Sequence, residues 1–188
     1  KMVLYAGLVW TVYNLAYFSI ISFGPALLLE RGLDVAAAGA AISLASWAAL
    51  PALPLGGYLA DRTGRPDLVL GISCILAAGA AALLPMTDHP YLLCAIVGLF
   101  AAAPAGLIMG RAISLMSPPH RAQGNAILYT FFYGGMGLIP SVVGWGADVT
   151  GTAATPLYFS ASALLLSVPL FLVLHAMASR LSVERAAV

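Results

Sequence analysis

The chain has 188 residues, of which 62% are hydrophobic and only 8% are charged, and its formal net charge is +1. Soluble domains carry about 25% charged residues, because their surface faces water. A chain with a mean hydropathy of +0.98 cannot bury its apolar surplus in one soluble core, so most of its outer surface is expected to face lipid. The composition excludes a soluble enzyme, a disordered tail and a nucleic-acid-binding protein.

Six windows without charged residues are long enough to cross a membrane. The hydrocarbon core of a bilayer is about 30 Å thick and needs about 20 apolar residues in a helix. The windows predict an all-α integral membrane protein with six transmembrane helices, over Met2 to Leu29, Val35 to Ala60, Leu68 to Met86, Tyr91 to Gly110, Gly124 to Ala147 and Pro156 to Ala178. Residues 1–188 are expected to form a single bundle.

Prolines and cysteines lie within these windows. The prolines are expected to mark bends rather than breaks, because neighbouring helices can satisfy the freed carbonyls; they are Pro25, Pro51, Pro54, Pro85, Pro104, Pro140 and Pro169. The two cysteines, Cys74 and Cys94, have no CxxC spacing and are interpreted as packing residues. No metal site or cofactor is expected.

The basic residues indicate how the six helices are oriented. Six crossings place both termini on one side, and seven of the eight basic residues fall on that side: Lys1, Arg62, Arg65, Arg111, Arg121, Arg180 and Arg185, against Arg31 on the other. The positive-inside rule therefore predicts cytoplasmic termini. We expect a multi-pass protein of a bacterial inner membrane.

One sequence pattern occurs twice. Gly57-Tyr58-Leu59-Ala60-Asp61-Arg62-Thr63-Gly64 recurs as Gly144-Trp145-Gly146-Ala147-Asp148-Val149-Thr150-Gly151, with five of eight positions identical. Each copy follows the second helix of a three-helix unit, so residues 1–90 and 91–188 are interpreted as inverted repeats. Inverted repeats of this kind are typical of secondary transporters. Chance similarity between small residues at two helix ends is the alternative.

The first copy of the pattern also resembles a known family signature. Gly57-x-x-x-Asp61-Arg62-x-Gly64-Arg65, between the second and third helices, resembles the signature loop of the major facilitator superfamily, and the stretch from Arg121 to Gly151 is similar to that family's penultimate helix. The resemblance covers the whole chain and implies the C-terminal six-helix half of a twelve-helix transporter. It departs from the family at Pro66, where the family has a second basic residue.

The resemblance implies a role in gating for the signature loop. An acid at a helix C-terminus is disfavoured by the helix dipole, so Asp61 needs a cationic partner or the N-terminus of another helix. Arg111 ends the fourth helix on the same face. We expect an ionic latch that closes the cytoplasmic side. The expected gating residues are Gly57, Asp61, Arg62, Gly64, Arg65 and Arg111; topogenic charge is the alternative. His175, within a turn of the same end of the last helix, is expected to be interfacial.

Polar and aromatic side chains within the spans form stripes that can line a pathway. Trp10, Tyr13, Asn14 and Tyr17 fall within an arc of about 100° on the first helix, and Asn125, Tyr129, Tyr133, Met136 and Pro140 within about 80° on the fifth. These rings combine apolar contact area with a polar handle, which favours a small organic solute. The expected substrate-binding residues are Tyr13, Asn14, Tyr17, Ser43, Trp47, Tyr129 and Tyr133. Interfacial aromatic residues are the alternative.

The absence of charge at the middle of the spans limits the function. A midplane charge is costly and usually functional, so this segment supplies no evident coupling residue or counter-charge. The sequence predicts transport, secondary active or facilitative, by alternating access, with the lipid bilayer, a small-molecule solute and either an N-terminal half or a second copy as partners. A non-transporting sensor or scaffold and an intramembrane serine protease using Ser73 and His175 are the alternative functions.

Overall fold

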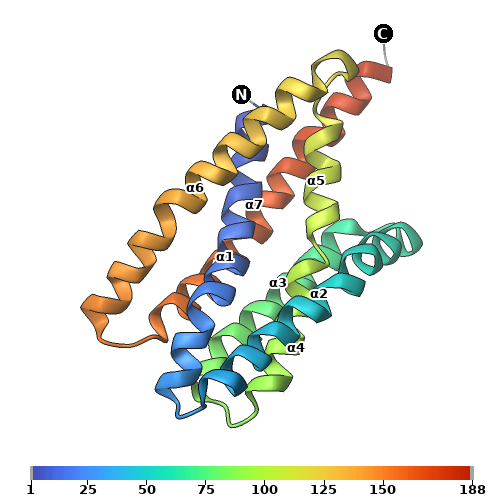
Figure 1. Cartoon of the computed structure of the whole chain (residues 1–188). Helices are drawn as coiled ribbons and strands as arrows, with labels where there is room; N and C mark the ends of the chain where they lie inside the picture. Colours follow the sequence, from blue (N-terminus) through green and yellow to red (C-terminus); the bar gives the residue numbers. More distant parts are fainter. Residues whose placement is uncertain (1, 187–188) are drawn as a thin grey trace.

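The computed structural model describes the backbone of residues 2–186 and the side chains of residues 2–180; Lys1 and the Arg185 side chain lie outside these ranges. Within them the chain is a helical bundle without strands (Figure 1). Its elements are α1 (Met2–Glu30), α2 (Val35–Thr63), α3 (Pro66–Leu83), the 3-10 turn η1 (Leu84–Met86), α4 (Pro90–Ala102), α5 (Ala105–Ser114), the 3-10 turn η2 (Pro118–His120), α6 (Arg121–Thr150) and α7 (Thr155–Ala186).

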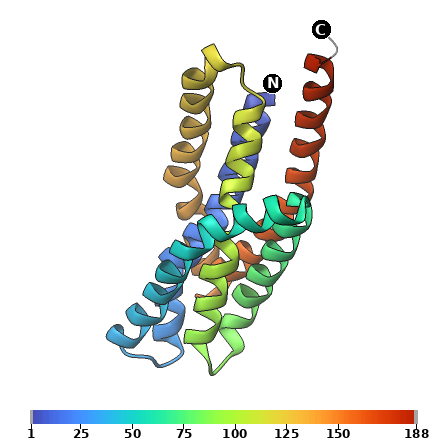
Figure 2. The same cartoon turned by 90° about the vertical axis from the view of Figure 1, so that its right-hand side faces the viewer.

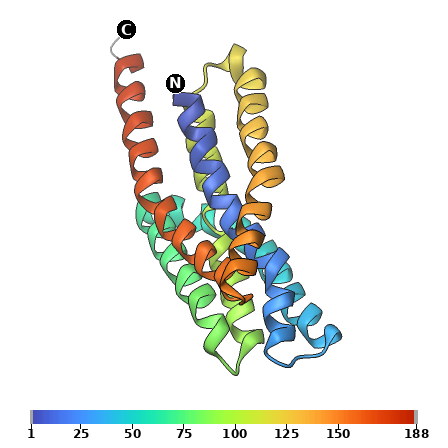
Figure 3. The same cartoon turned by 90° about the vertical axis from the view of Figure 1, so that its left-hand side faces the viewer.

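The six predicted crossings are confirmed. The described chain contains six segments long and apolar enough to span a bilayer, and the fourth of them, Pro90–Ser114, comprises α4 and α5. Both described ends of the chain lie at one end of the bundle, called here the termini face (Figures 1 and 2). The turns between α1 and α2 and between α3 and α4 lie at the opposite face (Figure 3). The turn between α6 and α7 is at the end of α6 that lies away from the termini (Figure 1).

Two of the prolines do more than bend a helix, which corrects the expectation from the sequence. At Pro104 the fourth span is divided, because α4 ends at Ala102 and α5 begins at Ala105. Pro85 lies in the 3-10 turn that ends the third span. Proline lacks the N–H that would continue the α-helical hydrogen bonds. By contrast, Pro25, Pro140 and Pro169 lie within continuous helices.

Small residues bring helices into backbone contact. A Cβ atom on Gly98 of α4 would overlap the Ala45 carbonyl of α2, and one on Gly56 of α2 would overlap the Ala103 carbonyl. Helix association in lipid depends on such close packing, since lipid tails are as apolar as the helices. α2 and α4 therefore form a tightly packed pair.

The helix α6 is the least buried of the spans. Only 11% of its apolar window is buried, against 44% for α1, α3, the fourth span and α7. It packs along α1, where Gly7 faces Phe131 and Gly135 faces Thr11. The main core lies between α1, α3, α4, α5 and α7, with Ile20, Leu70, Ile108, Leu164 and Phe171 fully buried. A large part of α6 is thus left available for contacts outside the bundle.

Candidate functional site

A cavity of about 590 Å³ opens between the end of α2 and α5. Figure 1 shows the α2–α3 turn directed away from α5 at this level. Asp61 and Arg111 both line the cavity, together with Gly57, Ala60, Gly64, Pro66, Gly106, Leu107 and Gly110. The structure therefore brings four of the six expected gating residues to one cavity.

The backbone of the signature loop accounts for its glycine and proline. Gly64 ends α2 in the left-handed conformation, with φ of 64°, and donates its N–H to the Ala60 carbonyl. A glycine adopts this conformation without the penalty that a Cβ atom imposes. Pro66 is the first residue of α3, a position where a missing N–H costs nothing. The proline that departs from the family pattern thus starts a helix.

The remaining basic residues of the loop face away from the cavity. Arg62 donates to the Tyr58 hydroxyl at 3.0 Å, one turn earlier on α2. The Arg65 backbone N–H donates to the Thr63 hydroxyl at 3.4 Å. Both arginines are exposed, and neither lines the cavity.

Arg111 has a partner other than Asp61. Its Nη2 lies 3.3 Å from Nε2 of His175 on α7, and Nδ1 of His175 lies 2.5 Å from Oδ1 of Asp67 on α3. Within residues 2–180, no hydrogen bond or ion pair involves the Asp61 carboxylate. In this conformation, then, Asp61 and Arg111 share a cavity without forming a pair.

Sequence analysis did not find this three-residue cluster. It placed Arg111 and His175 at the same face, but it left His175 as an interfacial residue and gave Asp67 no role. The available signal was that Asp67, Arg111 and His175 each lie within about two turns of one membrane face. Their approach depends on how α3, α5 and α7 are rotated, which charge placement alone does not reveal.

On α1, the stripe of polar and aromatic residues is divided between core and surface. Tyr13 is buried, and its hydroxyl donates to the Ala101 carbonyl of α4. Asn14 and Tyr17 are half-buried, and the Asn14 amide donates to the Trp10 carbonyl at 2.8 Å. The Tyr13 hydroxyl thus holds two helices together, whereas Asn14 and Tyr17 retain some exposure.

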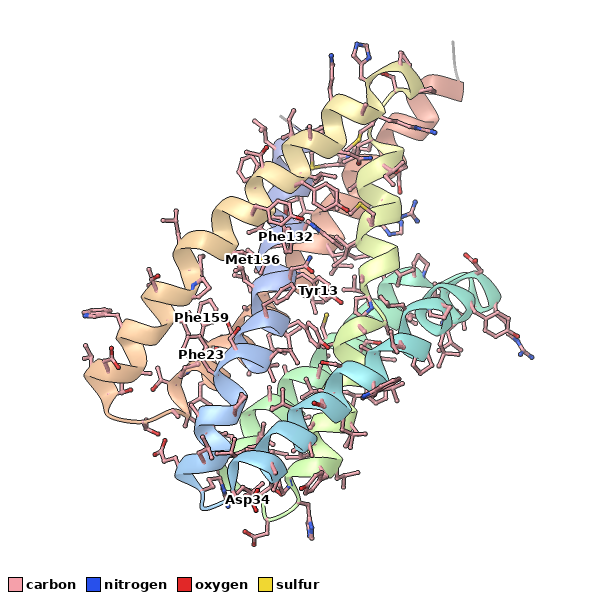
Figure 4. All side chains as sticks on the ribbon, in the orientation of Figure 1. Tyr13, Phe23, Asp34, Phe132, Met136 and Phe159 are labelled. Atoms are coloured by element: carbon pink, nitrogen blue, oxygen red, sulfur yellow. The ribbon has the colours of Figure 1, made fainter. Side chains whose placement is uncertain are left out.

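The aromatic residues of α6 lie on an exposed face. Tyr129 and Tyr133 are 43% and 65% exposed, and their rings stack with centroids 6.0 Å apart. Phe132 connects them to α1, since its ring lies 6.4 Å from that of Trp10 and 5.9 Å from that of Phe18. In Figure 4, Phe132 and Met136 project from α6 toward α1.

A second exposed face of α6 is of a different kind. At 100° per residue it lies opposite the tyrosines, and its large exposed residues are Ile127, Phe131, Leu138, Val142, Trp145 and Val149. The buried residues Leu128 and Phe132 lie between the two faces. One exposed face is thus mainly aliphatic, with the rings of Phe131 and Trp145 on it, and the other contains stacked tyrosines.

The two expected residues of α2 lie on its surface. Ser43 is exposed, and Trp47, one turn later, is 69% exposed. Among the described residues, no ring contact joins Trp47 to Tyr129 or Tyr133. Trp47 on α2 and the stacked tyrosines on α6 are therefore not in ring contact in this conformation.

A second cavity, of about 480 Å³, lies at the opposite face beside the end of α6. Four of its lining residues, Gly144, Ala147, Asp148 and Gly151, occupy the repeat positions of Gly57, Ala60, Asp61 and Gly64 in the first cavity. Gly151 also ends its helix as Gly64 does, with φ of 69° and its N–H donated to the Ala147 carbonyl. The repeated sequence thus makes the same local structure twice.

Comparison with known proteins identifies the family. The model of the Major Facilitator Superfamily matches residues 8–187, nearly the whole chain. No curated protein matches the sequence. The six apolar helices and this match together show that the chain is a multi-pass membrane protein that belongs to the Major Facilitator Superfamily, a family of transporters rather than enzymes.

Proposed function

We propose that this chain is the C-terminal six-helix half of a solute transporter that works by alternating access, with its termini face in the cytoplasm. One observation carries the proposal: the same four motif positions line a cavity at each face of the bundle. A transporter built from inverted repeats needs equivalent gating structures on both sides of the membrane. The distribution of basic residues supports the orientation.

The surface of α6 supports a pathway on one side of this half. Its aliphatic face suits lipid, whereas its face with Tyr129 and Tyr133 suits a solute, because tyrosine combines ring contact with a hydroxyl. The other proposed contacts with the solute are made by Asn14, Tyr17, Ser43 and Trp47. Tyr13 contributes indirectly, because it holds α1 against α4. A small organic solute is the proposed substrate. The pathway is completed by an N-terminal half or by a second copy of the chain.

The structure gives no support to a protease. Ser73 is buried in the continuous helix α3, and the ring nitrogens of His175 face Asp67 and Arg111. A serine nucleophile needs a base within hydrogen-bond reach, and no bond between Ser73 and His175 occurs in the described part of the chain.

The experiment is transport by the chain reconstituted in proteoliposomes. Light scattering in detergent first gives its mass as a monomer or a dimer. Uptake is then measured for a panel of radiolabelled glucose, proline, benzoate and tetraethylammonium. We expect uptake of at least one solute class by the assembled pathway. Uptake should be reduced in Tyr133→Ala. It should be retained in Tyr158→Ala, the control, because Tyr158 is an exposed tyrosine of α7. Uptake that stays at the level of empty liposomes in both the dimer and the chain joined to an N-terminal half would favour a scaffold instead.

A further inference from the structure

A groove of about 400 Å³ lies along the contact between α1 and α6. Its walls include Thr11 of α1 and Thr130, Phe131, Gly134, Gly135 and Leu138 of α6. Phe131 and Leu138 belong to the face of α6 that lies opposite the stacked tyrosines. A Cβ atom on Gly134 would meet no atom within 4 Å, so the missing side chain leaves the space beside it open. The groove therefore lies away from the solute contacts proposed for α6.

Exposed leucines of α1 continue this groove toward the termini face. Leu4 and Leu8 lie about two turns and about one turn before Thr11, on the same side of the helix, and both are exposed. Figure 3 shows α1 between α6 and α7 in this part of the bundle. The groove and the two leucines thus form an apolar track that begins at the termini face.

The described walls of the groove offer no free hydroxyl proton. Thr11 donates to the Gly7 carbonyl at 2.7 Å, and Thr130 donates to the Ala126 carbonyl at 2.8 Å, each within its own helix. No charged residue lines the groove among the described residues. A polar solute would lose its hydrogen bonds to water there, and a buried water molecule needs two to four polar partners. A hydrocarbon chain meets neither penalty.

The dimensions of the groove fit one acyl chain. A methylene group has about the volume of a water molecule, which is about 30 Å³, so the groove holds roughly a dozen methylenes. With a rise of about 1.5 Å per residue, Thr130 lies about 14 Å and Leu138 about 26 Å beyond Arg121, the first residue of α6. One leaflet with its headgroups is about 20 to 22 Å thick. A lipid with its headgroup at Arg121 would therefore reach the groove.

Arg121 is suited to a negatively charged headgroup. Its side chain is exposed, and its guanidinium has no hydrogen bond or ion pair within residues 2–180. The described acids of the termini face, Asp61 and Asp67, lie at the α2–α3 turn, apart from the start of α6 (Figures 1 and 2). A guanidinium can bind a phosphate through two parallel hydrogen bonds, and anionic lipids attract basic residues at the membrane surface.

We infer that the groove binds one acyl chain of an anionic phospholipid from the leaflet at the termini face, with the phosphate held by Arg121. The apolar walls, the depth of the groove and the exposed arginine all fit this ligand. A bound chain would add packing contacts to α6, which is the least buried of the spans. The inference does not depend on whether the chain transports a solute.

The test is native mass spectrometry of the 188-residue chain in detergent, titrated with phosphatidylglycerol or with phosphatidylcholine of the same acyl chains. We expect one phosphatidylglycerol to bind about fivefold more tightly than phosphatidylcholine, the effect of one arginine beside an anionic headgroup. Gly134→Leu places a side chain in the groove, where its Cβ atom meets no neighbour, and should abolish this tight binding. Gly137→Leu is the matched control, because Gly137 is also exposed with open space around it but does not line the groove.

Two arginine variants test the headgroup contact separately. Arg121→Gln should lower the affinity for phosphatidylglycerol to that for phosphatidylcholine. Arg180→Gln, at an exposed arginine of α7, should leave it unchanged, because the described end of α7 and the start of α6 lie on opposite sides of α1 (Figures 2 and 3). Equal affinities for the two lipids in the native chain, or unchanged tight binding in Gly134→Leu, would overturn the inference. A dimer that Gly134→Leu converts to a monomer would also overturn it, since a second copy would then occupy the groove.

Discussion

Gly98 in α4 lies so close to Ala45 in α2 that a Cβ atom on the glycine would overlap the alanine carbonyl. Later in both segments, Gly56 of α2 stands in the same relation to Ala103, the residue after the end of α4. Two backbone contacts of this kind fix both the spacing and the rotation of α2 against α4. Because α2 carries Asp61 and the fourth span carries Arg111, this packing sets how the two walls of the cavity face each other.

A larger residue at position 98 should separate the two helices. Gly98→Val places side-chain atoms where the Ala45 backbone lies, and overpacking of this kind costs about 1 to 3 kcal/mol. We expect a lower unfolding temperature in detergent, measured by the fluorescence of a thiol-reactive dye at the buried cysteines. Gly79→Val is the matched control, since Gly79 is exposed in the helix α3 with open space around it. Equal losses in the two variants would contradict the contact.

The membrane spans could be predicted from the sequence because they depend on hydropathy. Hydropathy is summed over neighbouring residues and does not require knowing how the helices pack. Charge-free windows of about 20 residues have few alternatives in lipid, and the six predicted windows match the six observed segments. The conformation of the loop glycines also depends on nearby sequence alone, since Gly64 and Gly151 both end helices in the left-handed conformation.

What could not be predicted depends on how helices rotate against one another. Tyr13 and Tyr17 share a stripe on α1, yet Tyr13 is buried against Ala101 and Tyr17 is only half-buried. The same limit hid the contacts of His175 with Asp67 and Arg111. The division of the fourth span at Pro104 was missed because a proline in a bundle can either bend or end a helix.

Loss of the Glu30 carboxylate should loosen the turn between α6 and α7. Glu30 at the end of α1 accepts the Ala153 backbone N–H at 2.9 Å, and its other oxygen lies 3.5 Å from the Thr152 hydroxyl. Glu30→Ala removes a charge-assisted hydrogen bond that contributes about 1.5 to 3 kcal/mol, less in so exposed a place. Hydrogen exchange of residues 151–155 should become faster. Asp148→Ala, at an exposed acid without such a bond, should leave this exchange unchanged; equal rates in native protein and Glu30→Ala would contradict the contact.

The stacked tyrosines of α6 should contribute to solute affinity. Tyr133→Ala removes the more exposed ring and leaves Tyr129 without its stacking partner. We expect the KM of uptake to rise about tenfold, which corresponds to about 1.4 kcal/mol, while Tyr133→Phe keeps most of the affinity. The measurement is initial uptake rate against solute concentration in proteoliposomes. An unchanged KM in Tyr133→Ala would place this face of α6 outside the pathway.

Asp61 should control how often the cavity at the termini face is closed. The carboxylate is exposed and lines the cavity opposite Arg111, so a pair with the arginine would add little net stability but would favour the closed arrangement of α2 and α5. Asp61→Asn keeps the size of the side chain but removes the charge that would attract the arginine. We therefore expect the protein to insert and fold normally while its cavity stays open for a larger fraction of the time.

The fraction of protein with an open cavity can be measured by the reactivity of a cysteine placed inside the cavity. Gly110 lines it, and a Cβ there meets no atom within 4 Å, so Gly110→Cys should be tolerated and react with a membrane-impermeant maleimide only when the cavity is open. Labelling should be faster when Asp61→Asn is added. Asp148→Asn, the same change at the equivalent repeat position of the opposite face, should not alter it. If Asp61→Asn leaves the labelling rate unchanged as well, Asp61 does not act as a latch, and its place in the signature loop reflects topology or contact with lipid headgroups.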